Sequence, residues 1–445
     1  MRKNMSAKSM GIFTTGVTLA GLVAFAAPAA AETPTPTFVR SSVKTGGGQV
    51  TQKDLNFEEV SLSNDARFTL FTSNATDLVP GDTNGAWDVF LRDSLENVTT
   101  RVSVSSSGEQ GEGEMSSASS DPSMSADGRY VVFESHAENL VAGDTNRRKD
   151  VFLRDTVTSV TTRLSLTEDG GQAASESGDA AISPDGHFVA FESYAPLVAS
   201  DTDSEADVYL RELATGRTVR VSESSDGLPL RDPRYGFGSL AVTAGGRHVL
   251  FESAAENLVP GDTNGRYDVF VRDMAAGTTV RASVSGTGAQ ADGSSSGATM
   301  SANGRYVAFT SSAKNLRPDT GGHPMQAYVR DLVENTTTLA SLRDGDSPQG
   351  EEFTETARIS PDGRHLAFQI AFVPGTKAGI YVRDLNARTS RLVTVSPTGG
   401  PLDGDSWGAH FSADGHHLAF ESNASNLVDD DTNKAQDVFV RLNVL

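Results

Sequence analysis

The chain has 445 residues, a formal net charge of −21 at pH 7 and no cysteine. Without cysteine it forms neither disulfides nor thiolate metal sites, so its stability must come from packing. The acidic balance argues against nucleic acid and anionic membranes as partners, because both are bound by positive surfaces.

Residues 1–31 have the pattern of a secretory signal peptide. Arg2, Lys3 and Lys8 precede an apolar run rich in Ala and Gly, and Ala29 and Ala31 supply the small residues that signal peptidase recognises. No later stretch of the sequence is long and apolar enough to span a membrane. We expect residues 32–445 to form a single domain that is secreted or periplasmic, with no membrane anchor.

One phrase recurs seven times after the signal region. It consists of a Ser-x-Asp-Gly turn, an apolar run with a Phe, a Gly-Asp-Thr-Asn-Gly segment and an Asp-Val-Phe-Val-Arg-Asp segment. The third residues of the seven turns lie 52 to 62 positions apart, at Asp65, Asp127, Asp185, Gly245, Asn303, Asp362 and Asp414. A fixed period of this size is the mark of a repeat architecture.

The second copy illustrates the four strands expected in every repeat. These are residues 121–125, 130–135, 150–155 and 161–166, rich in β-branched and aromatic side chains, with a tight Asp-Gly turn after the first. No segment has sustained helical periodicity. Four-stranded units at this spacing are blades of a β-propeller. The sequence therefore predicts an all-β fold, a seven-bladed β-propeller of four-stranded antiparallel blades.

The two ends of the repeat region predict how the ring closes. The seventh copy stops at Arg441, after its third strand, whereas residues 38–43 resemble the fourth strand at 100–104 and belong to no copy. We expect this N-terminal strand to complete the last blade and to remove the exposed strand edges of an open ring.

The repeat resembles that of the TolB-like (WD40-like) β-propellers. The resemblance is carried by Ser-Pro-Asp-Gly-His-Phe-Val-Ala-Phe-Glu-Ser (183–193) and Ser-Pro-Asp-Gly-Arg-His-Leu-Ala-Phe (360–368), and it covers essentially the whole mature chain. Similar repeats occur in prolyl-oligopeptidase-type peptidases and in some polysaccharide lyases. It implies a free-standing propeller without the N-terminal domain of TolB, and it is weak evidence for function, because propellers have many activities.

An acidic loop follows the second strand in five copies. Its acidic and amide side chains lie at positions 1, 3 and 7, a pattern of oxygen ligands that suits a hard cation such as Ca²⁺. The positions are Asp82/Asn84/Asp88, Asp144/Asn146/Asp150, Asp201/Asp203/Asp207, Asp262/Asn264/Asp268 and Asp431/Asn433/Asp437. A second interpretation is structural: the side chains form Asx turns, and the last Asp begins the third strand. Calcium is the one cofactor that the sequence suggests, and both interpretations stay open.

An arginine ends the third strand in every copy, at Arg92, Arg154, Arg211, Arg272, Arg330, Arg383 and Arg441. Its uniformity indicates a scaffold role. We expect a buried guanidinium paired with a carboxylate such as Asp127 or Glu134, because a buried charge needs a partner.

Irregular segments are the other places for a binding site, since ligand sites usually break the symmetry of a ring. The connector around residues 228–235 is basic and aromatic where other connectors hold Gly, Ser and Glu, and a further irregular loop replaces the acidic loop near residue 323. His410 lies on an innermost strand and is expected at the central channel. The predicted ligand rim consists of Arg231, Arg234, Tyr235, His323 and His410.

Catalytic motifs are weak, so we favour a non-catalytic scaffold that binds a ligand or a protein. The partner class is an extracellular or envelope protein or a glycan, and a monomer is expected. The alternative is a polysaccharide-lyase-like or other hydrolytic enzyme that uses the central channel. That alternative needs several His or carboxylate groups converging on the channel, and the sequence nominates His410 alone.

Overall fold

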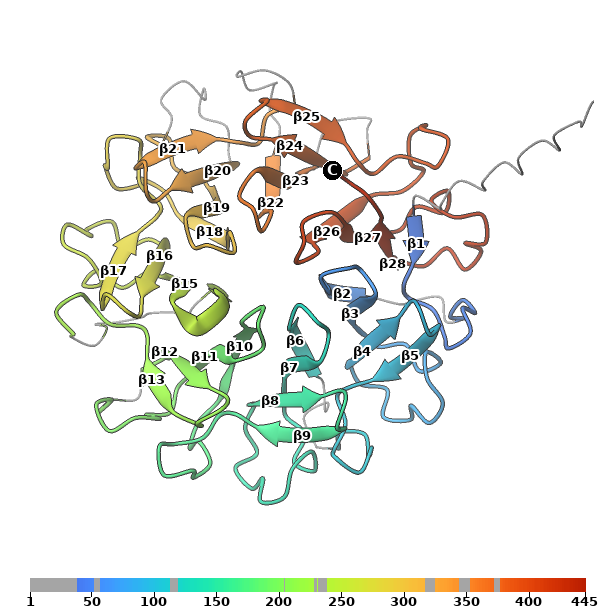
Figure 1. The fold of residues 1–445 in the computed structure, drawn as a ribbon, viewed down its shortest axis with the longest axis horizontal. Helices are drawn as coiled ribbons and strands as arrows, with labels where there is room; N and C mark the ends of the chain where they lie inside the picture. Colours follow the sequence, from blue (N-terminus) through green and yellow to red (C-terminus); the bar gives the residue numbers. More distant parts are fainter. Residues whose placement is uncertain are drawn as a thin grey trace, which may run out of the picture. The chain divides into compact units, whose positions relative to one another are not determined.

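The computed structural model describes residues 38–51, 57–112, 119–203, 205–227, 230, 238–316, 325–343, 353–371 and 377–445. Within residues 37–445, which form one compact unit, the described residues contain 28 strands and one 3₁₀ helix, η1 (Ala244–Gly246). The strands form seven four-stranded antiparallel sheets arranged as the blades of a ring (Figure 1). This confirms the predicted all-β, seven-bladed fold.

Each blade runs outward from an innermost strand, in chain order. Blades 1 to 4 consist of β2 (Phe57–Leu62), β3 (Phe68–Ser73), β4 (Asp88–Asp93) and β5 (Val98–Arg101); β6 (Ser119–Met124), β7 (Tyr130–Ser135), β8 (Asp150–Asp155) and β9 (Val160–Arg163); β10 (Ser177–Ile182), β11 (Phe188–Ser193), β12 (Asp207–Glu212) and β13 (Thr218–Arg220); β14 (Gly238–Val242), β15 (His248–Ser253), β16 (Asp268–Asp273) and β17 (Thr278–Arg281). Blades 5 to 7 consist of β18 (Ser295–Met300), β19 (Tyr306–Ser311), β20 (Gln326–Asp331) and β21 (Thr336–Leu339); β22 (Phe353–Ile359), β23 (His365–Ala371), β24 (Gly379–Asp384) and β25 (Thr389–Leu392); β26 (Ser406–Phe411), β27 (Leu418–Ser422), β28 (Asp437–Arg441) and β1 (Phe38–Arg40).

The hydrophobic core lies between neighbouring blades. In blade 1, Phe71 and Phe90 stack with ring centroids 5.9 Å apart, and both join a buried cluster that includes Val438 and Val440 of blade 7. An aromatic pair occupies the equivalent positions of the second and third strands in all seven blades. The apolar run in each repeat is therefore explained by strands whose two faces are both covered by adjacent blades.

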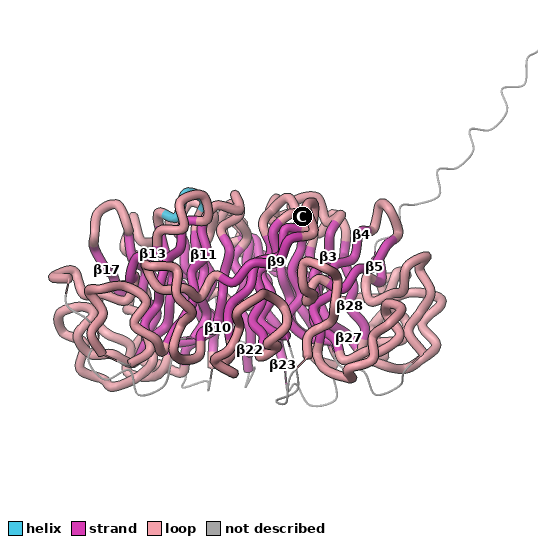
Figure 2. Tube along the Cα trace, turned by 90° about the horizontal axis from the view of Figure 1, so that it is seen from below, coloured by secondary structure: helices cyan, strands magenta, loops and turns pink. Residues whose placement is uncertain are grey.

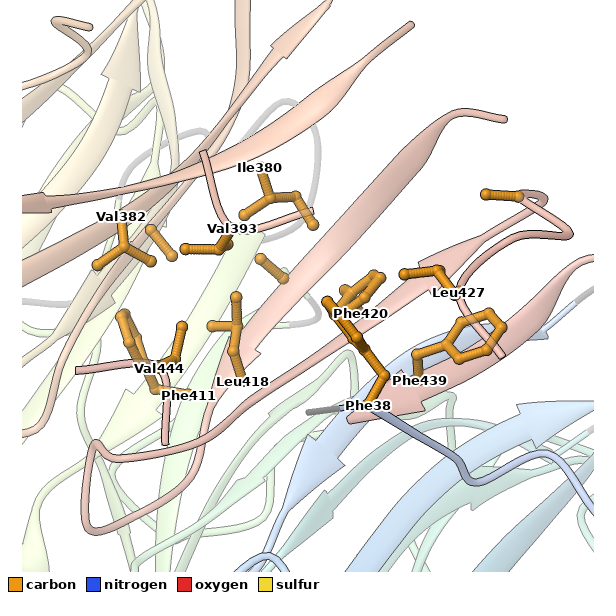
Figure 3. Close-up of a cluster of buried hydrophobic side chains, with 13 residues drawn as sticks. Phe38, Ile380, Val382, Val393, Phe411, Leu418, Phe420, Leu427, Phe439 and Val444 are labelled. Carbon is orange, nitrogen blue, oxygen red and sulfur yellow. The ribbon is translucent and has the colours of Figure 1, made fainter. Parts of the chain in front are cut away.

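The N-terminal strand completes the last blade, as predicted. β1 pairs antiparallel with β28, and Phe38 lies opposite Arg441 in the register. The ring of Phe38 contacts Phe420 edge-on, 6.1 Å between centroids. Figure 3 shows Phe38 beside Phe420 and Phe439 in the cluster between blades 6 and 7. Blade 7 thus combines the first and last strands of the described chain.

The strand order gives the ring two different faces. Turns that join the first to the second strand, and the third to the fourth, lie on one face, here called the turn face. The acidic loops and the connectors between blades lie on the other, the loop face. In the side view the helix η1, which belongs to the first turn of blade 4, marks the turn face (Figure 2).

The repeated glycine of the turn face is required by its backbone and by its neighbour. Gly128 has φ +74°, and a Cβ atom there would lie 2.4 Å from the ring of Phe68 in the preceding blade. Asp127 accepts hydrogen bonds from the Ser125 hydroxyl and from the Arg129 backbone N–H. The Asp-Gly turn therefore both shapes a blade and packs it against the previous one.

Five of the seven third-strand arginines are buried and two, Arg211 and Arg441, are half-buried, but the expectation that Asp127 or Glu134 pairs with the arginine of blade 2 is wrong. Arg154 donates hydrogen bonds to the Ser105 carbonyl and the Thr161 hydroxyl instead. Asp127 is occupied in its own turn, and Glu134 forms an ion pair with Lys149, 2.8 Å between charged atoms. Burial lowers the pKa of Arg154. In blade 2 the partners are neutral because the guanidinium reaches the connector between blades, where backbone carbonyls are available, whereas Arg272 of blade 4 does pair with a carboxylate, Glu223, at 3.5 Å.

In the described part of the chain, no helix is long and apolar enough to cross a membrane. Residues 1–37, which include the predicted signal peptide, lie outside the described residues. The domain boundary at residue 31 and the secretion that it implies therefore stay predictions.

Candidate functional site

Each of the five acidic loops encloses an arginine of its own blade. In blade 1, the Arg101 Nη1 atom lies 3.2 Å from a carboxylate oxygen of Asp82 and 3.2 Å from one of Asp88. The side chains of all three residues are nearly inaccessible to solvent. The Ser103 hydroxyl adds a hydrogen bond of 2.5 Å to Asp88. We call this Asp–Arg–Asp arrangement the loop clamp.

The same clamp recurs in blades 2, 3, 4 and 7. The guanidinium comes from the fourth strand each time, and in blade 7 it comes from the N-terminal strand β1. The distances from Nη1 to the two carboxylates are 3.3 and 3.4 Å for Arg163, 3.6 and 3.6 Å for Arg220, 3.1 and 3.5 Å for Arg281, and 3.8 and 3.9 Å for Arg40.

The middle residue of each loop forms a local turn and, where it is an asparagine, a bridge to the following connector. The Asn146 side-chain oxygen accepts a bond of 2.9 Å from the Arg148 backbone N–H, and its amide donates to the Ala173 carbonyl. The connector residue Gln172 in turn donates to Asp144, at 2.8 Å. These are the Asx turns of the structural interpretation, and they tie the loop to the next blade.

The other three asparagines of the predicted calcium ligands, Asn84, Asn264 and Asn433, make the same contacts. Their side-chain oxygens accept the backbone N–H two residues later, at 3.2, 2.9 and 3.1 Å. Their amides donate, at 3.4, 3.0 and 3.2 Å, to the connector carbonyls of Gly111, Ala291 and Val50. The oxygen that each asparagine would offer to a cation is thus already engaged in a turn. This geometry favours the structural interpretation over the predicted ligand role of Asn84, Asn264 and Asn433.

The clamps do not fit a calcium site well. Ca²⁺ takes six to eight oxygen ligands, whereas here a guanidinium lies among the carboxylates that would bind the ion. Burial raises the pKa of Asp207 and of Asp437 to about 7, against the pull of the arginines, so these carboxylates are not strongly ionised at neutral pH. Calcium binding by these loops stays a prediction, which a binding measurement decides.

Blade 3 carries the most acidic of the five clamps. Asp203 replaces the Asn of the other copies, and its carboxylate lies with those of Asp201 and Asp207 within 4.8 Å. Arg220 lies among them, however, and it also pairs with Glu223 at 3.3 Å. The Tyr209 hydroxyl donates a hydrogen bond to the Asp201 carboxylate. The half-buried Asp203 accepts a hydrogen bond of 3.0 Å from the Glu205 backbone N–H, the same local turn that the asparagines form in the other clamps.

Blades 5 and 6 lack the clamp as a whole. The strand register places Leu339 and Leu392 where the clamp arginine lies elsewhere: they pair with Tyr328 and Tyr381, as Arg101 pairs with Phe90. In blade 5, Gln326 replaces the last Asp of the loop and accepts a bond from Ser341. The last Asp of the loop and the fourth-strand arginine are thus replaced together, although the fifth copy keeps Asp319 at the first acidic position, outside the described residues. Sequence reasoning missed this correlation, although the fourth-strand Arg is visible in the repeat.

A second set of equivalent residues surrounds the ring axis. They lie on the innermost strands, two positions before the Ser or Thr that begins each turn, and all are partly exposed to solvent although both sequence neighbours are mostly buried. We call this set the axial ring. Its seven members, in blade order, are Ser61, Ser123, Ala181, Ala241, Thr299, Arg358 and His410.

The side chains of the axial ring are small and uncharged in blades 1 to 5, whereas those of the adjacent blades 6 and 7 are the basic residues Arg358 and His410. Arg358 of β22 donates bonds of 3.4 Å to the backbone carbonyls of Gly297 and Ala357. The Nδ1 atom of His410, on β26, lies 2.9 Å from the Phe411 carbonyl oxygen. Burial and the charge of Arg358 lower the pKa of His410 to about 4, so the imidazole is neutral at pH 7. His410 lies on the innermost strand β26, its role in the ligand rim stays a prediction, and Arg358 was not among the residues predicted from the sequence.

Glu252 adds a carboxylate to this side of the axis. It is only 3 % exposed, and it accepts a bond of 2.8 Å from the Ala298 backbone N–H of the next blade. Burial raises its pKa to about 6. Its charge acts favourably on Arg358. Among the described residues, however, no carboxylate oxygen lies within 4.0 Å of the Arg358 guanidinium, the distance that defines an ion pair.

The remaining rim residues, Arg231, Arg234, Tyr235 and His323, lie outside the described residues. Their convergence on one channel mouth therefore stays a prediction.

Clefts between blades, by contrast, belong to the scaffold. One of about 640 Å³ lies between blades 3 and 4, and one of about 440 Å³ between blades 5 and 6. Equivalent residues line the two, such as Gly246 and Gly363, or Arg272 and Arg383. A cleft that the repeat itself produces does not distinguish one blade as a binding site.

Comparison with known proteins establishes the fold alone. No protein-family model matches the chain, and no curated protein matches it. Among solved structures, an oligogalacturonate lyase in complex with manganese is 13 % identical, with a TM-score of 0.54 over 88 % of this chain and 92 % of that one. The β-propeller domain of the trilobed protease from Pyrococcus furiosus is 9 % identical, with a TM-score of 0.53 over 87 % and 96 %. TolB from Acinetobacter baumannii is 14 % identical, with a TM-score of 0.40 over 78 % of this chain and 64 % of that one.

Proposed function

We propose that this protein is a secreted, non-catalytic propeller that binds a ligand or a protein at its axis, on the side of blades 5 to 7. The observation that carries the proposal is a coincidence of two asymmetries. The clamp is absent from blades 5 and 6, and the axial ring becomes basic in blades 6 and 7. A feature present in every blade stabilises the ring, whereas a feature confined to adjacent blades can select a ligand.

The rival function is an enzyme that uses the axis, and one observation favours it. Arg358 and His410 are residue types that serve acid–base and charge-stabilising roles, and they lie in a fold similar to that of an oligogalacturonate lyase. A lyase or hydrolase also needs a group that removes or donates a proton at the substrate. The buried Glu252 is engaged with backbone N–H groups instead. We therefore favour binding without turnover.

Calorimetry with a panel of ligands tests the proposal. The panel holds oligogalacturonate, a neutral maltooligosaccharide and short acidic and neutral peptides, and hydrogen exchange of the inner strands locates the bound ligand. Binding of any member that protects β22 and β26 and leaves the ligand intact supports the proposal. Product formation that is lost in Arg358→Ala would establish the enzyme instead. Protection confined to the outer strands, or no binding by the panel, would overturn the axial location.

Export and a monomeric state are parts of the same proposal. N-terminal sequencing of the protein recovered from outside the cytoplasm is expected to begin at Glu32. Sedimentation is expected to give the mass of one chain. The partner is proposed to be an extracellular or envelope protein or a glycan, and calcium is tested below.

A further inference from the structure

We propose that Arg358 and His410 form a binding site for one anionic group, a carboxylate or a phosphate, of the axial ligand. This inference rests on the proposed function, because it assigns a chemical class to the ligand at the same place.

Arg358 differs from the clamp arginines by lacking a carboxylate partner, and from the third-strand Arg154 by lacking any hydrogen bond shorter than 3.4 Å. Arg101 has two carboxylates at 3.2 Å, but Arg358 has two backbone carbonyls, both at the long distance of 3.4 Å through a single nitrogen, Nη1. A guanidinium carries five N–H donors in a planar fork that matches a carboxylate or a phosphate. The N–H groups of Arg358 that lack strong hydrogen bonds are therefore the main donors that the site offers to an anion.

His410 supplies a second donor when the ligand arrives. Its Nδ1 atom faces the Phe411 carbonyl, so this nitrogen carries the proton in the neutral ring and Nε2 has the lone pair. Protonation turns Nε2 into a charged donor. An anion bound to Arg358 offsets the repulsion between the guanidinium and the imidazolium, which now lowers the pKa of His410.

The neighbouring blades leave room for a ligand group at this level. The other five members of the axial ring are Ser, Ala or Thr, so neither a long nor a charged side chain competes for the axis there. Gly297 and Gly408 lie in the inner strands on either side of β22, with φ of +64° and +65°. At Gly297 a Cβ atom would have Thr310 as its neighbour at 3.5 Å. Gly297 therefore adds no side chain of its own beside Arg358, and Thr310 is the nearest neighbour at that point.

The charges that face the pair give the site a defined pH dependence. They are Arg358, the only cation of the axial ring at neutral pH, His410 itself and Glu252. Glu252 loses its negative charge below pH 6, and His410 gains a positive charge toward pH 4. Both changes favour an anion. Since an anion binds the protonated forms more tightly, binding takes up protons, and the affinity rises as the pH falls from 7 to 5.

The experiment uses inorganic phosphate and sulfate as anionic probes, with glycerol as the neutral control. Titration calorimetry at pH 5 and pH 7 measures the affinity, and NMR follows the Cε1–H signal of His410. We expect sulfate, whose charge is the same at both pH values, to bind more tightly at pH 5, and saturating phosphate to raise the pKa of His410. Arg358→Gln is expected to weaken binding about tenfold to a hundredfold, as the loss of charge-assisted hydrogen bonds implies, and Arg358→Lys to retain part of it.

Arg364→Gln is the matched control, because Arg364 lies on the turn face and pairs with Asp384 at 3.1 Å. It should leave binding unchanged, and thermal melting should confirm that all three variants fold. No measurable binding of either anion, binding that Arg358→Gln leaves unchanged, or a His410 pKa that does not respond to phosphate would overturn the anion site. An uncharged ligand that still protects β22 and β26 in Arg358→Gln would leave the proposed function standing while removing this inference.

Discussion

Blade 1 and blade 5 have the same strands and the same stacked aromatic pair, but they secure the loop face in different ways. Blade 1 buries two carboxylates around Arg101, whereas blade 5 places Gln326 and Leu339 at the corresponding registers. The last Asp of the loop and the clamp arginine are present together or absent together. They form one energetic unit, since a buried carboxylate without its arginine, or the reverse, is costly. The comparison also shows that a blade folds without the clamp.

Removing the arginine alone gives the largest expected effect. Arg101→Leu leaves Asp82 and Asp88 buried without a cation, and we expect the free energy of unfolding to fall by about 3–5 kcal/mol. Urea unfolding measures it. The triple variant Asp82→Asn/Asp88→Gln/Arg101→Leu places the Gln and Leu of blade 5 at two positions and removes the remaining buried charge, so it should regain more than half of the loss. If the triple variant is no more stable than Arg101→Leu, the clamp is not a unit.

The same variant sharpens the calcium question. In the wild type the guanidinium lies among the carboxylates, so neither 1 mM Ca²⁺ nor a chelator should change the melting temperature. In Arg101→Leu the freed oxygens of the loop can take a cation, and Ca²⁺ should raise the melting temperature by about 2–4 °C. A chelator that lowers the melting temperature of the wild type would instead support calcium binding by the native loops.

A smaller effect is expected from the pH dependence of the clamp that closes the ring. The pKa of Asp437 is raised to about 7 in the folded protein, above the ordinary value of 3.8. The folded state therefore holds this proton more tightly, and its contribution to stability is full below pH 3.8 and lost as the pH rises through 7.

Asp437→Asn tests this sign. Its melting temperature should depend less on pH between 4 and 7 than that of the wild type, in which stability falls over this window. The matched control is Asp384→Asn, since Asp384 lies on the turn face with a lowered pKa, which backbone hydrogen bonds from its own turn and Arg364 produce. That control should not flatten the curve, and a slope equal to the wild type in Asp437→Asn would contradict the argument.

The smallest effect is expected where an ion pair is exposed. Arg364 and Asp384 lie 3.1 Å apart on the turn face of blade 6, and over half of the Arg364 side chain is accessible. Arg364→Ala should cost less than about 1 kcal/mol, and the loss should shrink further in high salt. A loss as large as that of Arg101→Leu would mean that burial does not separate the two kinds of pair.

The sequence predicts the architecture because the same pattern of strands and turns occurs in seven copies. The blade number, the strands around the Asp-Gly turn and the closing strand at Phe38 all follow from local patterns. Partners across the sheet could not be read in the same way. Arg101 meets Asp82 only because the strand register brings them together, and the third-strand arginines reach carbonyls of a connector that no side-chain pattern reveals.

The axial site was half visible from the sequence. The sequence indicates His410 because it is a histidine on an innermost strand. Arg358 is recognised as unusual only when the seven copies are aligned on their turns and its position is compared between them. That alignment shows it among Ser, Ala and Thr. The other rim residues lie in segments that depart from the repeat, where the pattern gives no register to reason from.

The pairing of β1 with β28 also governs when the ring can form. The hydrogen bond from Val438 to Ser42 joins residues 396 positions apart. The ring therefore cannot close at blade 7 until the residues of both β1 and β28 are available to pair, although the two strands stand at opposite ends of the propeller sequence.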